Sequence, residues 1–325
     1  MSVLFPESLE SLELKLTDGL ASVEAMLRAE IASDYELADI TARHLVEAGG
    51  KRFRPLLVLL AAEFGDSSAP GVVPSAVVVE LTHLATLYHD DVMDEATVRR
   101  GAQSANARWG NSVAILSGDF LFARSSKILA DLGPEAVRVQ AQTFERLVIG
   151  QLMETVGPKD GEDAVKHHIQ VLADKTGSLI AAAGRYGAMM SGVSAELTNV
   201  IAEFGEAIGI AFQLSDDLLD IESNVSGKTP GTDLREGVKT LPALLALADP
   251  SLDARLRDLL SRPLPDDDEH AEALAALRVH PAMGAARGVL GEWTAKSISC
   301  LDQLPDGDAK EALRTLCDSV ANRAI

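Results

Sequence analysis

Apolar residues recur every three or four positions along most of this chain. The pattern is clear at 7–31, 36–47 and 55–64, where it has the period of an α-helix. Similar runs follow at 104–132, 134–156, 163–190 and 195–222, and three or four shorter ones continue to the C-terminal end. No pair of alternating strands joined by a hairpin turn is evident. The pattern therefore predicts an all-α protein.

The segment behind Pro74 predicts the most apolar of these helices. Proline suits the first turn of a helix, and the sequence SAVVVELTHLATLYHDDVMDEA is long enough for a buried one. Its valines leave a short strand at 76–79 as the alternative. Two stretches rich in turn-forming residues, 224–233 and 261–268, predict loops. We expect one all-helical domain over 1–325, with a core at about 34–260 and a C-terminal helical part at about 269–325.

Composition narrows the class of protein. Lys and Arg number 29 against 49 Asp and Glu, so the formal net charge is −20 and a nucleic-acid partner is not expected. With 47% hydrophobic residues the chain can bury a core, yet no apolar run is long enough to span a bilayer. The acidic N-terminal segment lacks the features of a signal peptide, which predicts a cytoplasmic location. Two cysteines, Cys300 and Cys317, are too few for a disulfide framework.

One short pattern, Asp-Asp-x-x-Asp, occurs twice. Its members are Asp90, Asp91 and Asp94 in HDDVMD, and Asp216, Asp217 and Asp220 in SDDLLD. On a helix the last carboxylate lies one turn from the first two, and like charges at that spacing repel. A cation would relieve the repulsion, and Mg²⁺ fits best because it binds carboxylates together with water and substrate phosphates. A solvated acidic face is the alternative for one such motif, but both copies are embedded in apolar sequence.

The few basic residues gather in compact sites that suit anion binding. Lys51 and Arg54 follow two glycines that allow close backbone approach, and a helix is expected just after them. Arg99 and Arg100 come five and six residues after the first Asp motif, within reach of a phosphate bound there. The alternatives are a basic turn at a helix start and a surface pair at a fraying helix end. Glycine-rich nucleotide loops are missing, so nucleotides are not implied.

The Asp motifs and the basic sites belong to five segments that follow one another along the chain: GGKRFRP, HLATLYHDDVMDEATVRRG, KTGSLIA, FQLSDDLLD and GKTPGTDLREG. In these segments and their order, the chain resembles the trans-isoprenyl diphosphate synthase family over about 49–242. It implies an isoprenoid synthase type helical bundle around a deep central cavity whose mouth carries both Asp motifs, and usually a homodimer. It also implies a prenyltransferase that condenses isopentenyl diphosphate with an allylic diphosphate, head to tail, to a trans-polyprenyl diphosphate.

The resemblance also assigns roles to single residues. Three Mg²⁺ ions held by the six aspartates would bind the allylic diphosphate, helped by Arg99, Lys175 and Lys228. Isopentenyl diphosphate would be held by Lys51, Arg54, Arg100 and His83, while Thr176 and Gln213 would be supporting polar contacts. The residues expected to act on the leaving group are Asp90, Asp91, Asp94, Lys175, Asp216 and Lys228. Lys239 is displaced by one residue from the family's Gly-Lys-x-Thr, a rotation of about 100° on a helix, so its role as a phosphate ligand stays open.

Ala85 and Thr86 precede the first Asp motif by about one turn and are expected to line the cavity for the growing hydrocarbon. In the family, bulky aromatics there stop growth early, so this pair favours a medium or long product. A geranylgeranyl or farnesyl diphosphate synthase is the alternative. A terpene cyclase is disfavoured because only 4% of the residues are aromatic. A non-catalytic subunit of a heteromeric synthase would not need both Asp motifs, and a plain helical bundle with acidic ends would bind no diphosphate.

Overall fold

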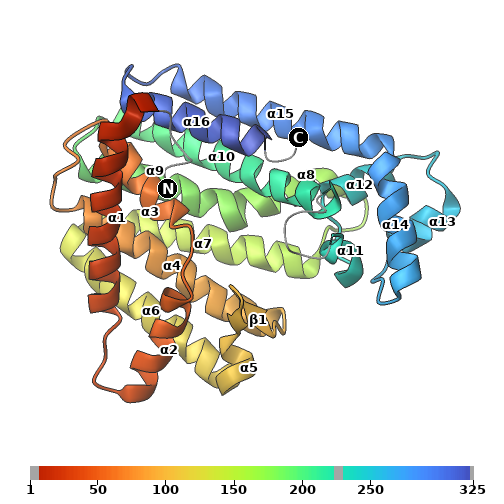
Figure 1. The fold of residues 1–325 in the computed structure, drawn as a ribbon, viewed down its shortest axis with the longest axis horizontal. Helices are drawn as coiled ribbons and strands as arrows, with labels where there is room; N and C mark the ends of the chain where they lie inside the picture. Colours follow the sequence, from red (N-terminus) through yellow and green to blue (C-terminus); the bar gives the residue numbers. More distant parts are fainter. Residues whose placement is uncertain (1–6, 223–229, 323–325) are drawn as a thin grey trace. The chain divides into compact units, whose positions relative to one another are not determined.

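The computed structural model describes residues 7–222 and 230–322, which are mostly helical (Figure 1). The all-α prediction is confirmed. The chain divides into two compact units. The first comprises Met1–Phe144, Leu179–Ala202 and Gln303–Leu313, and the second comprises Glu145–Ser178, Glu203–Asp302 and Arg314–Ile325. No helix within the described ranges combines the length and hydropathy needed to cross a membrane.

The first unit contains most of the N-terminal elements. They are η1 (Glu7–Leu9), α1 (Glu10–Glu30), α2 (Glu36–Glu47), α3 (Phe53–Ala62), α4 (Val72–Met93), β1 (Val98–Arg99), β2 (Ala102–Gln103), α5 (Ala105–Trp109), α6 (Asn111–Leu132) and nearly all of α9 (Ser178–Met190). Four helices have residues in both units: α9, of which only Ser178 belongs to the second unit, α7 (Pro134–Val156), α10 (Ala195–Glu222) and α16 (Asp308–Asn322).

The second unit contains the remaining elements. They are α8 (Ala164–Leu172), the π-helical turn η2 (Ala173–Gly177), α11 (Thr232–Glu236), α12 (Leu241–Ala248), α13 (Ala254–Leu259), α14 (Asp267–Val279) and α15 (Pro281–Leu301). Beyond residue 222 the described part of the chain thus forms six helices, where three or four were expected. The extra breaks follow from N-caps, because the side chains of Asp253, Asp266 and His280 accept hydrogen bonds from the first backbone N–H groups of α13, α14 and α15.

Helix α4 is the centre of the first unit and packs against α6, α3 and α1. The alternative strand at 76–79 is wrong, because Val77, Val78 and Val79 are all helical and fully buried. A helix buried on all sides tolerates β-branched residues, since tertiary packing outweighs their weak helix propensity. Backbone approach is close elsewhere in this unit: a Cβ added to Gly187 of α9 would lie 2.0 Å from the Val58 carbonyl oxygen of α3.

Three local features depart from the helical pattern. A two-residue antiparallel hairpin, β1 with β2, follows α4, although the sequence showed no hairpin signal. Its turn, Arg100-Gly101, has positive φ at both residues (53° and 77°), as a tight hairpin turn requires, but it lacks the usual Asn-Gly sequence. The expected helix at 104–132 is broken at Gly110, whose φ is 86°, and the expected helix at 163–190 contains the π-helical turn η2.

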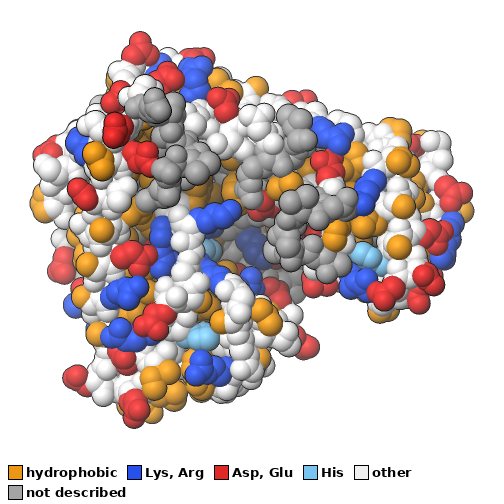
Figure 2. Space-filling view, viewed as in Figure 1, with side chains coloured by type: hydrophobic (Ala, Val, Ile, Leu, Met, Phe, Trp, Pro, Cys, Tyr) orange, Lys and Arg blue, Asp and Glu red, His pale blue; other side chains and the backbone are white. Residues whose placement is uncertain are grey.

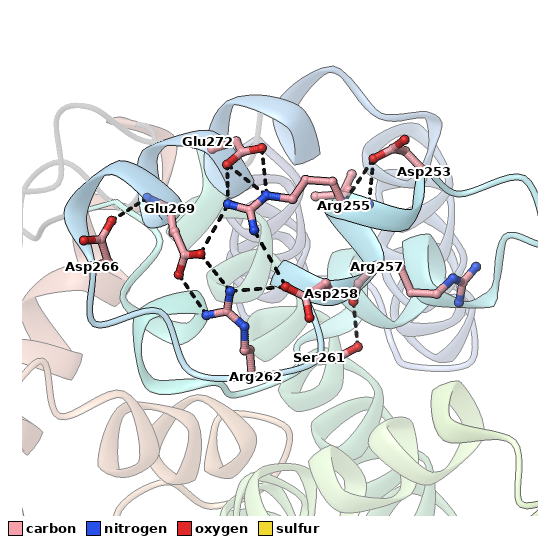
Figure 3. Close-up of polar contacts among 10 residues, drawn as sticks. Asp253, Arg255, Arg257, Asp258, Ser261, Arg262, Asp266, Glu269 and Glu272 are labelled. Carbon is pink, nitrogen blue, oxygen red and sulfur yellow. Dashed lines mark hydrogen bonds and ion pairs between the residues drawn. The ribbon is translucent and has the colours of Figure 1, made fainter.

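In the second unit a network of ion pairs joins α13, the loop behind it and α14 (Figure 3). Arg262 donates two hydrogen bonds, of 2.8 and 2.9 Å, to the carboxylate of Glu269, and Arg255 donates hydrogen bonds to Glu269 and Glu272. This arrangement strongly lowers the pKa of Glu269, to about 2, chiefly through its bond to Arg262. The predicted loop at 261–268 is confirmed up to the start of α14 at Asp267, and the network holds it in place.

Candidate active site

The first Asp motif lies at the C-terminal end of α4 and is not uniform. Asp90 is half-buried and Asp94 is exposed, whereas Asp91 is completely buried. Asp91 Oδ1 accepts a hydrogen bond of 2.6 Å from Arg99 Nε, and its Oδ2 is a buried atom without a hydrogen-bond partner. Burial raises the pKa of Asp91, although the bond to Arg99 acts in the opposite direction. The middle carboxylate therefore faces the protein.

The β1–β2 hairpin explains how two arginines come to their positions. Arg99 lies on β1 and reaches back to the end of α4, while Arg100 occupies the turn. Arg100 Nη1 donates hydrogen bonds to the carbonyls of Leu45, at 3.1 Å, and Gly49. The hairpin thus connects the first Asp motif with the GGKRFRP loop inside the first unit. Neither arginine lies on a fraying helix end, which removes that alternative.

The GGKRFRP loop is held by Arg52, a basic residue of this segment for which the sequence predicted no specific ligand. Arg52 has a left-handed backbone, with φ of 49°. Its buried guanidinium pairs with Glu24, with Glu80 at 2.7 Å and with the carbonyl of Val46 at 3.0 Å. Because the Arg52 side chain is fixed inside the protein, it holds in place the backbone that carries Lys51 before it and Arg54 after it.

Three of the predicted diphosphate ligands belong to the same unit. Lys51 is exposed and Arg54 is half-buried, with a buried Nε that has no partner. Burial lowers the pKa of Arg54, and burial together with Arg54 and Arg100 lowers the pKa of His83 well below its usual value. His83 is therefore neutral near pH 7, and the unsatisfied Arg54 Nε could donate to an anion. Figure 2 shows Lys and Arg side chains gathered over this part of the first unit.

The second Asp motif, at the C-terminal end of α10, also has a buried middle aspartate and two outer aspartates that are less buried. Asp217 is buried, and its Oδ2 accepts hydrogen bonds from His168 Nε2 at 2.8 Å and from the Leu241 backbone at 3.3 Å. Asp216 and Asp220 are half-buried. The Asp220 carboxylate also accepts from the first two N–H groups of α11, at 3.1 and 3.3 Å.

The remaining predicted ligands of the second unit are dispersed along the chain. Lys175 and Thr176 lie in the π-helical turn η2 and are half-buried, and the ammonium of Lys175 pairs with Glu154 of α7. Gln213 is half-buried on α10, one turn before the second Asp motif, and Lys239 is exposed between α11 and α12. Lys228 lies outside the described residues.

The carboxylates of the two Asp motifs suit Mg²⁺, which keeps water and phosphate ligands, better than a metal ion that is coordinated by protein side chains alone. Within the described residues, no three His, Cys, Asp or Glu side chains come close enough to hold one ion. The middle aspartate of each motif is bonded to its own unit, and the outer pairs, Asp90 with Asp94 and Asp216 with Asp220, carry the more accessible carboxylates. Mg²⁺ commonly takes one or two carboxylates and completes its shell with water and phosphate oxygens.

The two residues expected to limit chain length differ in burial. Ala85 is completely buried where α4 meets α6, and a Cβ added to Gly118 of α6 would lie 3.0 Å from the Ala85 carbonyl oxygen. Thr86 is half-buried, and its hydroxyl bonds the His83 carbonyl at 2.8 Å. Of the pair, only Thr86 presents accessible surface in this structure.

Comparisons with known proteins agree on one family. The sequence matches the polyprenyl synthetase family over residues 36–277. It is similar to a nonaprenyl diphosphate synthase of Mycobacterium tuberculosis, with 50% identity over 94% of this chain and 92% of that protein. It is also similar to an octaprenyl diphosphate synthase of Escherichia coli, with 30% identity over 97% and 99%.

A solved structure extends the comparison to the fold. A geranylgeranyl pyrophosphate synthase of Corynebacterium glutamicum, solved with calcium and isoprenyl diphosphate, is 46% identical to this chain. It superposes with a TM-score of 0.89 and covers 97% of this chain and 98% of its own. The names of these relatives span different product lengths, so similarity alone does not decide the product.

Proposed function

The chain belongs to the polyprenyl synthetase family, and we propose that it condenses isopentenyl diphosphate with an allylic diphosphate to a medium or long trans-polyprenyl diphosphate. It is a prenyltransferase. The observation that carries the proposal is the presence of two complete Asp-Asp-x-x-Asp motifs, each at a helix end with its middle carboxylate bonded to the protein. A non-catalytic subunit would have no need for both.

In this reaction the allylic C–O bond breaks and a C–C bond forms to the double bond of isopentenyl diphosphate. The aspartates of the two motifs would hold Mg²⁺, three ions by the family resemblance. When bound, Mg²⁺ neutralises charge on the departing diphosphate. Arg99 and Lys175 would add positive charge to the diphosphate site. The new C–C bond leaves a carbocation on the former isopentenyl unit, which loses a proton to the departing diphosphate and forms a new double bond, so no side-chain base is required.

Isopentenyl diphosphate would be held by Lys51, Arg54, Arg100 and His83. The carbonyls of Leu45 and Gly49 orient the Arg100 guanidinium, and the buried Nε of Arg54 has an unused donor. The lowered pKa of His83 favours its neutral form, which can donate one hydrogen bond, so Lys51 and the arginines would supply the positive charge at this site.

Product length is proposed from the small residues at 85 and 86. Because Ala85 is enclosed, Thr86→Phe is the sharper test of the hydrocarbon wall. The variant is expected to give a shorter dominant product than the wild type when dephosphorylated products are sized by chromatography. Thr97→Phe, at an exposed position after α4, is the control. An unchanged product distribution in Thr86→Phe would count against this wall.

We also propose that two copies of the chain associate through α7. A stripe of apolar side chains on this helix is exposed to solvent, and its members follow one another at intervals of three or four. Its residues are Val137, Ala141, Phe144, Val148, Leu152 and Val156. A continuous apolar stripe on a long helix suits a second copy of the same helix.

The activity test uses purified protein, Mg²⁺, labelled isopentenyl diphosphate and geranyl, farnesyl or geranylgeranyl diphosphate as primer. A chelator is expected to abolish incorporation, and Asp90→Asn to lower kcat about 100-fold or more. Asp160→Asn, in an exposed turn, is the matched control. If the wild type incorporates no label with any primer, the proposal fails, and release of diphosphate from the primer alone would then indicate a cyclase.

A further inference from the structure

The π-helical turn η2 is the most unusual element of the second unit. It comprises Ala173–Gly177, between α8 and α9, and it carries Lys175 and Thr176. Such turns are rare because they disrupt the regular i to i−4 hydrogen bonds of the helix, and they persist where surrounding contacts hold them. The contacts of η2 therefore show what fixes the direction of Lys175.

Arg146 of α7 makes the largest set of these contacts. Its Nε donates to Asp174 Oδ1 at 2.6 Å, its Nη2 to the Ala173 carbonyl at 3.2 Å, and its Nη1 to Glu206 of α10 at 2.8 Å. One guanidinium thus binds both the backbone and a side chain at the start of the turn. Since a guanidinium is rigid and planar, it fixes their relative orientation.

The Asp174 carboxylate is fully engaged by the protein. Its second oxygen accepts a hydrogen bond of 2.7 Å from Gln170, and the Ser178 hydroxyl donates to its backbone carbonyl at 2.5 Å. The Asp174 side chain is only 10% exposed. Although it is next to Lys175, this aspartate serves to anchor the turn.

Two glycines let the neighbouring helices lie directly against η2. A Cβ on Gly150 of α7 would come within 2.7 Å of the Lys175 backbone nitrogen. A Cβ on Gly177 would lie 3.2 Å from the Glu206 carbonyl oxygen of α10. Arg146, Gly150 and Glu154 are spaced by four residues, so they form one face of α7, and that face meets the backbone and the ammonium of Lys175.

From this arrangement we propose that Arg146 is a positioning residue: it holds the π-helical turn so that Lys175 presents its ammonium to the substrate diphosphate. The inference rests on the proposed function and adds to it a residue that no motif identified. Arg146 itself is bonded on all three nitrogens to protein atoms, so it acts through Lys175 and does not need to touch the substrate.

The test is a double-mutant cycle read by calorimetric binding of inorganic diphosphate in the presence of Mg²⁺. Arg146→Met and Lys175→Met are each expected to weaken binding about tenfold. The double variant is expected to bind no more weakly than Lys175→Met alone, since Arg146 acts through that lysine. Arg146→Lys, which keeps the charge but not the planar fork, is expected to recover part of the loss.

Additive losses in the double variant, or unchanged binding by Arg146→Met, would overturn the inference. Unfolding midpoints of every variant separate loss of structure from loss of positioning, and if Arg146→Met fails to fold, the cycle is run with Arg146→Lys. A wild type that binds diphosphate but elongates no primer refutes the proposed function and leaves this cycle interpretable. A wild type that binds none refutes both.

Discussion

The middle aspartate of each motif differs from its neighbours because of helix geometry. Residues four apart, such as Asp90 and Asp94, lie on one face of α4, whereas the residue after the first is rotated by about 100°. That rotation turns Asp91 toward Arg99 and, in the second motif, Asp217 toward His168. An identical carboxyl group thus has two roles, decided by its place on the helix.

Removing the partner of a buried carboxylate is expected to cost stability. Arg99→Met leaves the buried Asp91 without its ion pair, and because Arg99 is partly exposed we expect a loss of about 2 kcal/mol in the free energy of unfolding. Urea denaturation measures it, with Arg138→Met, whose ion pair with Glu135 is exposed, as the control. Equal stability of the two variants would mean that the Asp91 pair contributes nothing.

At this scale the sequence showed the candidate ligands but not the residues that bond to them. The repeated aspartates were visible as a local pattern, and so were the basic residues of the GGKRFRP and VRRG segments. The partners were not, because His168 and Asp217 are 49 positions apart and Arg146 and Glu206 are 60 apart. Long-range pairs leave no mark in periodicity. The metal, substrate and product assignments of single residues stay predictions.

At the scale of elements, helices could be predicted and their interruptions could not. The spacing of apolar residues predicted the long helices. On α1, for example, the buried residues follow one another at intervals of three or four: Leu12, Leu16, Leu20, Val23 and Leu27. The π-helical turn keeps nearly the same spacing of apolar residues as an α-helix, so it leaves no signal in the sequence. The hairpin turn has the sequence Arg100-Gly101, which shows no strong preference for such a turn. The single domain and the cytoplasmic location also stay predictions.

Close packing between α9 and α3 gives a test that does not depend on activity. Gly187→Ala would place a Cβ 2.0 Å from the Val58 carbonyl oxygen, so a helix must shift and we expect a loss of about 2 kcal/mol. Gly288→Ala on α15 meets no atom within 4 Å and is expected to be neutral or to stabilise by up to about 1 kcal/mol. Urea midpoints compare them; a stable Gly187→Ala would contradict the close approach.

The ion-pair network of α13 and α14 predicts a pH dependence of stability (Figure 3). Because the folded-state pKa of Glu269 is lowered to about 2 from 4.5, its contribution is present above pH 4.5 and is lost as the pH falls toward 2. The stability difference between wild type and Glu269→Gln should therefore narrow over that interval. Glu292→Gln, at an exposed position of α15, is the control. A stability difference between wild type and Glu269→Gln that stays constant down to pH 2 would contradict the lowered pKa of Glu269.

For the whole molecule, the α7 stripe predicts the state of association. Leu152→Glu is expected to convert a dimer into monomers, because a charge within an apolar interface would be desolvated. Light scattering behind size-exclusion chromatography measures the mass. Val279→Glu, whose parent residue is 85% exposed on α14, is the control. A monomeric wild type would mean that there is no such interface, and a variant that remains dimeric would place the interface elsewhere.

The division into two units has a consequence for how such a chain can be recombined. The chain passes between the units five times, and four of those passages fall within the continuous helices α7, α9, α10 and α16. A crossover between related genes at these points would join two parts of one helix from different parents. Productive chimaeras are therefore expected to have their junctions in the connections between helices, and neither unit can be inherited as one uninterrupted stretch of coding sequence.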